Sequence, residues 1–107
     1  GSSDSPVEPY SPMLGVYSIV CRQDLTGKPE GGWYPEERVS VYDAISMYTR
    51  NAAYSSYEED IKGTITVGKL ADFAVMEEDP FTVDPLHIKD IRVMQTWLGG
   101  KKVYEAE

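Results

Sequence analysis

The side chains that could do chemistry in this sequence are few and lie far apart. One is Asp4, in the opening stretch GSSDSPVEP, which is polar and broken by proline and so does not form a helix interior. A carboxylate on a loop can serve in binding or catalysis, because loops hold such groups more often than regular elements do. A short polar residue before proline also caps turns and helices. The local sequence leaves both interpretations of Asp4 open.

The remaining candidate groups favour structural interpretations. His87 is the single histidine and has no cysteine nearby, so the spacing of a zinc site is missing around it. Cys21 lies in a largely apolar stretch and is expected to be a small buried side chain, not a nucleophile. Ser2, Ser3 and Ser5 have no histidine within sequence reach to act as a base. The chain by itself therefore contains no complete catalytic constellation.

Composition limits the classes of partner. The 107 residues suffice for one small domain with a modest core. Ten basic against 18 acidic side chains give a net charge of −8, which disfavours nucleic acid, because phosphate binding depends on lysine and arginine. No apolar run approaches the ~20 residues that span a bilayer, and no signal peptide is visible. We expect neither a nucleic-acid nor a membrane partner, and a cytoplasmic location.

The first half of the chain predicts helices. Ser11 followed by proline predicts a helix start, and the apolar stretch that follows predicts a helix over residues 13–22. Ser40, with an acid three residues later, predicts a second start. Apolar side chains then recur every three or four residues from 41 onwards. The stretch 49–51 could end that helix and cap another over 52–58.

The second half predicts strands. Residues 64–67 alternate threonine with isoleucine and valine, which is typical of a strand. The apolar run 71–76 predicts a strand buried on both faces. A single helical turn is expected over 84–88, after an aspartate and a proline. Strands are expected over 91–98 and 101–105, joined by the hairpin signal of two glycines at 99–100.

Five short motifs, which follow one another in the expected order, resemble the C-terminal part of the metal-dependent amidohydrolase superfamily. The main motif is GTITVGKLADFAVM, in which a Gly-Lys turn and an Ala-Asp pair precede an apolar strand. The combination resembles amidohydrolase family 3, the branch with N-substituted formamide deformylase-like and N-acyl-amino-acid deacylase-like proteins. The five motifs occupy residues 3–7, 49–53, 63–76, 79–81 and 99–104, and their combination with residues 35–38 points to family 3.

The resemblance implies an α/β fragment of a larger fold. Residues 1–62 would be the end of a (β/α)-barrel, with the loop after its last strand and the helices that follow. Residues 63–107 would be the C-terminal part of a small β-sandwich built from both ends of a longer chain. Active sites of such barrels lie at the C-terminal ends of the strands, and Asp4 would fall there.

The resemblance also implies a role for Asp4 as both a catalytic residue and a metal ligand. In this family a divalent metal, usually zinc, activates a water molecule that attacks the carbonyl carbon of an amide or N-acyl substrate. The aspartate takes the proton of that water and delivers it to the leaving nitrogen. The family's histidine ligands are missing from this sequence, so we expect no tight metal binding and no hydrolysis by these 107 residues alone.

Two hypotheses remain open at this stage. In the first, the chain is the C-terminal portion of a hydrolase of carbon–nitrogen bonds other than peptide bonds, with a small-molecule amide as substrate. In the second, it is a stand-alone, non-catalytic interaction or structural domain derived from an amidohydrolase. In either case Phe73, Val75, Met94 and Trp97 would lie on strands with open edges, so we expect self-association.

Overall fold

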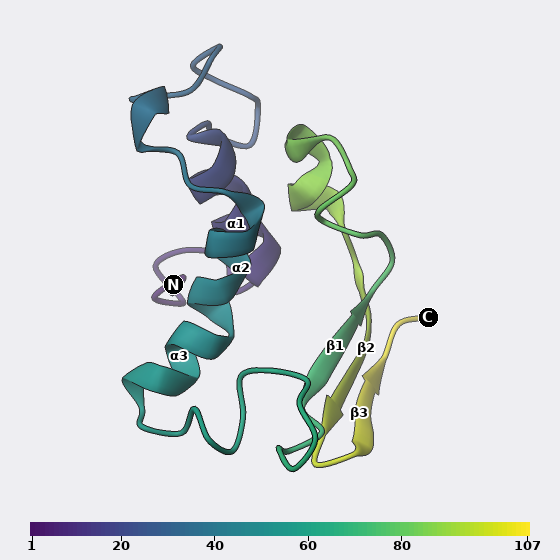
Figure 1. Cartoon of the computed structure of the whole chain (residues 1–107). Helices are drawn as coiled ribbons and strands as arrows, with labels where there is room; N and C mark the ends of the chain where they lie inside the picture. Colours follow the sequence, from purple (N-terminus) through teal and green to yellow (C-terminus); the bar gives the residue numbers. More distant parts are fainter.

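The computed structural model describes all 107 residues and sets a helical side against a three-stranded sheet (Figure 1). The helical side contains α1 (Pro12–Cys21), the 3-10 turn η1 (Pro35–Glu37), α2 (Val41–Tyr48) and α3 (Arg50–Ser55). Helix α1 has proline at its first position, as the sequence predicts, and Ser11 precedes it in an extended conformation. Both the helices and the strands follow the predicted order.

The start of α2 is a side-chain cap. The Ser40 hydroxyl oxygen accepts a hydrogen bond from the Asp43 backbone N–H (3.0 Å), and the hydroxyl donates to the Asp43 carboxylate (2.7 Å). The first bond satisfies a backbone N–H that the first helical turn would otherwise leave free, and the second joins the two side chains. Helix α2 ends at Tyr48, the backbone of Thr49 leaves the helical region, and α3 begins at Arg50. The predicted break is confirmed, but α3 begins two residues earlier than the sequence indicates.

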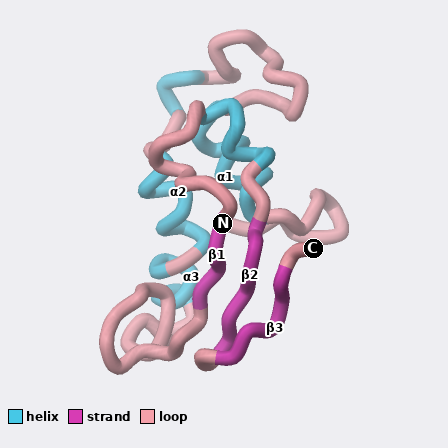
Figure 2. Tube along the Cα trace, turned by 90° about the vertical axis from the view of Figure 1, so that its right-hand side faces the viewer, coloured by secondary structure: helices cyan, strands magenta, loops and turns pink.

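The sheet contains β1 (Phe73–Met76), β2 (Val93–Leu98) and β3 (Lys101–Glu105), all antiparallel in that order. Figure 2 shows the three strands side by side. The turn between β2 and β3 is the glycine pair 99–100, with φ values of 55° and 77°. Positive φ at both central residues matches the twist of a tight hairpin, and glycine adopts it without a steric penalty.

Two strand predictions are wrong. Residues 64–67 do not form a strand, and Ile65 and Val67 are 89% and 103% exposed. An alternating pattern becomes a strand only when a neighbouring strand takes up its backbone hydrogen bonds, and none lies beside this segment. Strand β1 is not buried on both faces, because Val75 is exposed. It lies at the sheet edge, where β2 is its single strand neighbour.

The core is centred on α1, and η2 (Pro85–Asp90) closes it. This 3-10 segment, predicted as a helical turn, packs on α1 just before the chain enters β2. Tyr17 and Val16 of α1 and Ile88 of η2 are the largest fully buried side chains. The core consists of Met13, Val16, Tyr17, Val20, Cys21, Ala44, Ile88 and Ile91. Burial of these side chains therefore fixes the sheet to the helical side. The assignment of 1–62 to a barrel and 63–107 to a sandwich stays a prediction.

Candidate functional site

Asp4 lies in a tight turn at the start of the chain. Its backbone is in the left-handed region, at φ 51°, a conformation that aspartate adopts more readily than most residues. The Asp4 N–H donates to the Ser2 hydroxyl oxygen (3.0 Å), and the Asp4 carbonyl accepts from the Val7 N–H (3.0 Å). The Asp4 carboxylate takes part in no hydrogen bond or ion pair and is exposed. The side chain that caps this turn is Ser2, which leaves the Asp4 carboxylate free.

The residue at the start of this segment packs against the C-terminal end of α2. Gly1 lies against the ring of Tyr48, the last residue of α2. A cavity of about 570 Å³ separates this opening segment from α1. Gly15 of α1 lines it together with Tyr48. Asp4 itself does not line this cavity.

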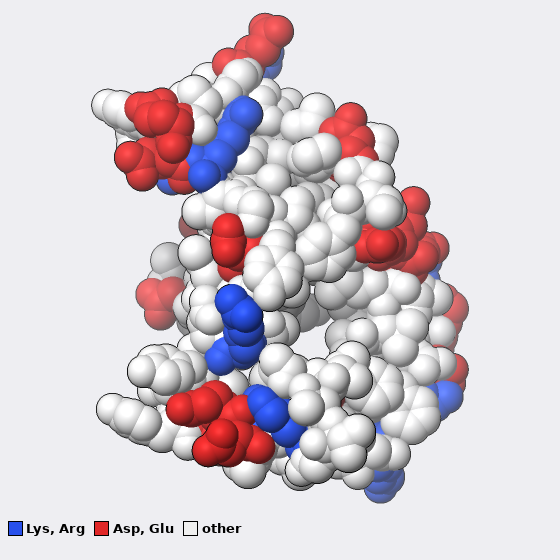
Figure 3. All heavy atoms as spheres, viewed as in Figure 1, with Lys and Arg blue, Asp and Glu red and all other residues white.

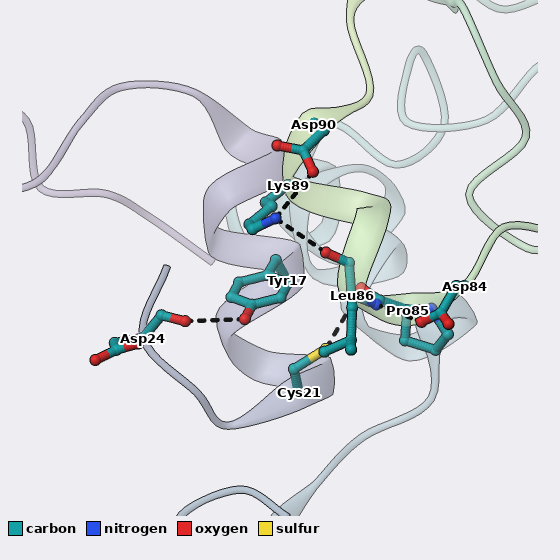
Figure 4. A network of polar contacts seen from close by, with 8 residues as sticks. All are labelled: Tyr17, Cys21, Asp24, Asp84, Pro85, Leu86, Lys89 and Asp90. Atoms are coloured by element: carbon teal, nitrogen blue, oxygen red, sulfur yellow. Dashed lines mark hydrogen bonds and ion pairs between the residues drawn. The ribbon is translucent and has the colours of Figure 1, made fainter. Parts of the chain in front are cut away.

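A second polar region joins α1 to η2 (Figure 4). The Tyr17 hydroxyl donates to the Asp24 carbonyl (2.9 Å), and the Cys21 thiol donates to the Pro85 carbonyl (3.4 Å). Burial raises the pKa of the Cys21 thiol and of the Tyr17 phenol. A thiol that stays protonated is a poor nucleophile. Cys21 is therefore structural, as the sequence indicates.

Lys89 completes this region. Its ammonium group contacts the Asp90 carboxylate (2.8 Å) and donates to the Leu86 carbonyl (3.2 Å). It also lies 5.7 Å from the centre of the Tyr17 ring, within range of a cation–π interaction. The hydrogen bond with Asp90 raises the pKa of Lys89. All of its contacts lie within η2 or between η2 and α1, so they stabilise that packing.

The structure does not bring the candidate metal ligands together. His87 is exposed on η2, and no three His, Cys, Asp or Glu side chains lie close enough to hold a metal ion. A zinc centre needs at least three protein ligands. The residues of this chain alone therefore do not fit the metal centre that the resemblance implies, and Asp4 is a single carboxylate.

The face drawn in Figure 3 shows no concentration of basic side chains. Figure 3 shows acidic side chains at several places on one face, with basic side chains between them, and a hollow between the helical side and the sheet. A cleft of about 460 Å³ lies there, lined by side chains of α3 and β1 that include Ala52, Ala53, Phe73 and Met76.

No helix of the structure is long and apolar enough to cross a bilayer.

Sequence reasoning missed two residues of the site. Tyr48 reaches from α2 to both Gly1 and Gly15, and the helical pattern alone marks it only as a core-facing position. Gly15 was a usable signal, because a glycine inside a helix weakens it unless a close neighbour needs the space. The contact between Gly15 and Tyr48 depends on how α1 and α2 pack, which local sequence does not specify.

Comparison with known proteins identifies relatives over almost the whole chain. The chain is 37% identical over 105 residues, 98% of its length, to "Putative amidohydrolase YtcJ" of Bacillus subtilis (strain 168). It is 32% identical over 97% of its length to "N-substituted formamide deformylase" of Arthrobacter pascens. It is 32% identical over 95% of its length to "Protein LONG AFTER FAR-RED 3" of Arabidopsis thaliana. No solved structure matches.

The chain covers only part of each relative. It spans 20%, 19% and 17% of their lengths, in the order given, or about a fifth. The model of the amidohydrolase family matches residues 1–104, which include the Asp4 turn, the three helices and all of the sheet except its last residue, Glu105. The resemblance seen in the sequence motifs is therefore confirmed, and the chain belongs to the amidohydrolase family.

Proposed function

We propose that this chain is the C-terminal portion of a metal-dependent hydrolase of carbon–nitrogen bonds other than peptide bonds. The family match over residues 1–104 carries the proposal. The name of the Arthrobacter pascens relative supports it, since a formamide deformylase cleaves the carbon–nitrogen bond of an amide. The proposed substrate is a small amide or N-acyl molecule, and the proposed location is the cytoplasm.

In this proposal Asp4 is the group of this chain that handles the proton. A carboxylate without hydrogen-bond partners can take a proton from an attacking water and deliver it to the leaving nitrogen. Its place on a turn supports this role, because the turn holds the backbone while the carboxylate stays accessible. Asp4 would also be the one metal ligand that this segment contributes.

The other metal ligands would lie outside these 107 residues. The proposed metal is zinc or another divalent ion, which supplies Lewis-acid chemistry when bound. The segment holds no group of three possible ligands, so hydrolysis by the segment alone is not expected. A full-length reading frame without further histidines upstream would contradict the proposal.

The decisive experiment is substitution of Asp4 by asparagine in the full-length protein. Loss of amide hydrolysis with an unchanged melting temperature is the expected result, since asparagine keeps the size of the side chain but cannot accept the proton. Asp60→Asn is the matched control, because Asp60 is exposed and takes part in no hydrogen bond or ion pair. Full activity of Asp4→Asn would remove Asp4 from the reaction.

One observation favours a second candidate, a non-catalytic interaction domain derived from an amidohydrolase. The chain has its own core and its own sheet, but no complete catalytic constellation. This alternative expects a well-folded, metal-free protein whose reading frame begins near residue 1. A longer frame whose product loses amide hydrolysis on removal of residues 1–107 would exclude it.

A further inference from the structure

Two helices approach each other closely at Gly15 of α1. A Cβ atom placed on Gly15 would lie 1.9 Å from the hydroxyl oxygen of Tyr48 and 2.9 Å from Cζ of the same ring. Any other residue at this position would have to displace the ring. Glycine destabilises the interior of a helix relative to alanine, so its presence here serves the close approach. Gly15 thus provides the space in which the Tyr48 side chain lies.

The Tyr48 ring also supports the start of the chain. A Cβ atom on Gly1 would lie 2.7 Å from Cε2 and 2.8 Å from Cζ of Tyr48. Gly1 therefore lies against the Tyr48 ring at the C-terminal end of α2.

The path from Gly1 to Asp4 is short and hydrogen-bonded. Ser2, the next residue, accepts the hydrogen bond from the Asp4 N–H (3.0 Å), and Val7 closes the other side of the turn. A shift of Gly1 would move the Ser2 hydroxyl away from the Asp4 N–H. The left-handed backbone of Asp4 would then lose one of the two hydrogen bonds that maintain it.

We propose that Tyr48 is a positioning residue for Asp4. Its ring lies in the space left by Gly15, supports Gly1 and thereby fixes the turn that presents the Asp4 carboxylate. The importance of Asp4 rests on the proposed function, whereas the contacts between Tyr48, Gly1 and Gly15 do not. The Tyr48 hydroxyl takes part in no hydrogen bond, so the proposal assigns this role to the ring alone.

The test is hydrogen–deuterium exchange by mass spectrometry on the full-length protein, read in peptides covering residues 1–10 and 93–105. Tyr48→Leu is expected to give several-fold faster exchange in the 1–10 peptide, which contains the bonded amides of Asp4 and Val7, and no change in the 93–105 peptide. The matched control is Tyr54→Leu, because Tyr54 is 67% exposed on the neighbouring helix. Equal exchange of residues 1–10 in these two variants would overturn the proposal.

A rescue experiment keeps the proposal testable if Tyr48→Leu unfolds. Gly15→Ala alone is expected to accelerate exchange in the 1–10 peptide, because the new methyl group collides with the Tyr48 hydroxyl. Adding Tyr48→Phe removes that oxygen and is expected to restore part of the protection, because the methyl group then meets only the ring carbon Cζ, at 2.9 Å. Equal exchange of the 1–10 peptide in Gly15→Ala and in the wild type would overturn the proposal. The exchange measurements do not depend on enzymatic activity. A fully active Asp4→Asn variant would therefore contradict the proposed function without changing the exchange result.

Steady-state kinetics of the same variants in the active full-length protein distinguish a role of Tyr48 in positioning Asp4 from a role in folding alone. Tyr48→Leu is expected to lower kcat with little change in KM, because a displaced Asp4 impairs proton transfer and not substrate binding. Tyr48→Phe is expected to keep kcat. An unchanged kcat in a Tyr48→Leu protein whose 1–10 peptide exchanges faster would show that the turn does not position a reacting group.

Discussion

The carboxylate of Asp72 accepts a hydrogen bond from the backbone N–H of Gly99, at 2.7 Å and across 27 positions of the chain. The Gly100 N–H donates to the Ala71 carbonyl beside it (3.0 Å). These two hydrogen bonds connect the β2–β3 turn to the residues that precede β1. The Ala-Asp pair of the main motif therefore has a structural role in this fold: it closes one end of the sheet.

Substitution of Asp72 by alanine should lower the free energy of unfolding by about 1 kcal/mol, because the Gly99 N–H loses a charged acceptor at an exposed site. Asp72→Asn keeps an acceptor oxygen and should cost less. Urea unfolding measures both effects, with Asp60→Ala as the control for loss of an exposed carboxylate. Equal midpoints for Asp72→Ala and Asp60→Ala would contradict this role.

Stability should fall at alkaline pH because of Cys21 and Tyr17. Burial raises the pKa of both groups, so the folded state favours their protonated forms. The unfolded chain loses these protons first, from about pH 8.5 for the thiol and about pH 10 for the phenol. The stabilisation is therefore complete below about pH 8.5 and is lost as the pH rises through the folded pKa values.

Thermal unfolding between neutral pH and about pH 10.5 measures this decline. Cys21→Val keeps a buried side chain of similar size but removes the thiol, so the first part of the decline should flatten. A wild-type melting temperature that stays constant over this range would refute the assignment.

The loop after α1 should depend on Asp24. One oxygen of its carboxylate accepts hydrogen bonds from the Thr26 N–H (2.8 Å), the Thr26 hydroxyl (2.7 Å) and the Lys28 N–H (3.0 Å). These bonds, led by that of the Lys28 backbone, lower the pKa of Asp24. A lowered pKa means that the stabilisation is present above the unfolded value of about 3.9 and is lost as the pH falls through the folded pKa.

Asp24→Ala should therefore be less stable than wild type at neutral pH, and the two melting temperatures should converge below about pH 4. Limited proteolysis should cut within residues 22–33 faster in this variant. Asp24→Asn retains an uncharged acceptor and should fall between the two. Equal cleavage rates for Asp24→Ala and wild type would show that the loop is held by other contacts.

The isolated chain should self-associate through its sheet. Strands β1 and β3 have open edges, and Val75 of β1 is 40% exposed. Unpaired backbone groups beside apolar side chains favour pairing with another chain. Light scattering over a concentration series should show association, and Val75→Lys should reduce it because a charge at an edge opposes pairing. A strictly monomeric wild-type chain at high concentration would contradict this expectation.

Local sequence determined the starts of α1 and α2, the break between α2 and α3, and the β2–β3 hairpin. The two helix starts and the hairpin depend on groups a few residues apart. These groups are Pro12 at a first helical position, Ser40 with Asp43, and two adjacent glycines. The family resemblance also came from the sequence alone, because the motifs and their order are visible in the sequence itself. Asp4 was selected in the same way, by its match to a family motif.

Tertiary structure decided the rest. Residues 64–67 have a strand pattern but no neighbouring strand, so Ile65 and Val67 stay exposed. The support of the Asp4 turn by Tyr48 joins positions more than forty residues apart, and it exists only because α1 and α2 pack closely enough to require Gly15. The spacing of apolar residues indicates which side of a helix is buried. Which side chains that side contacts depends on how the whole chain packs.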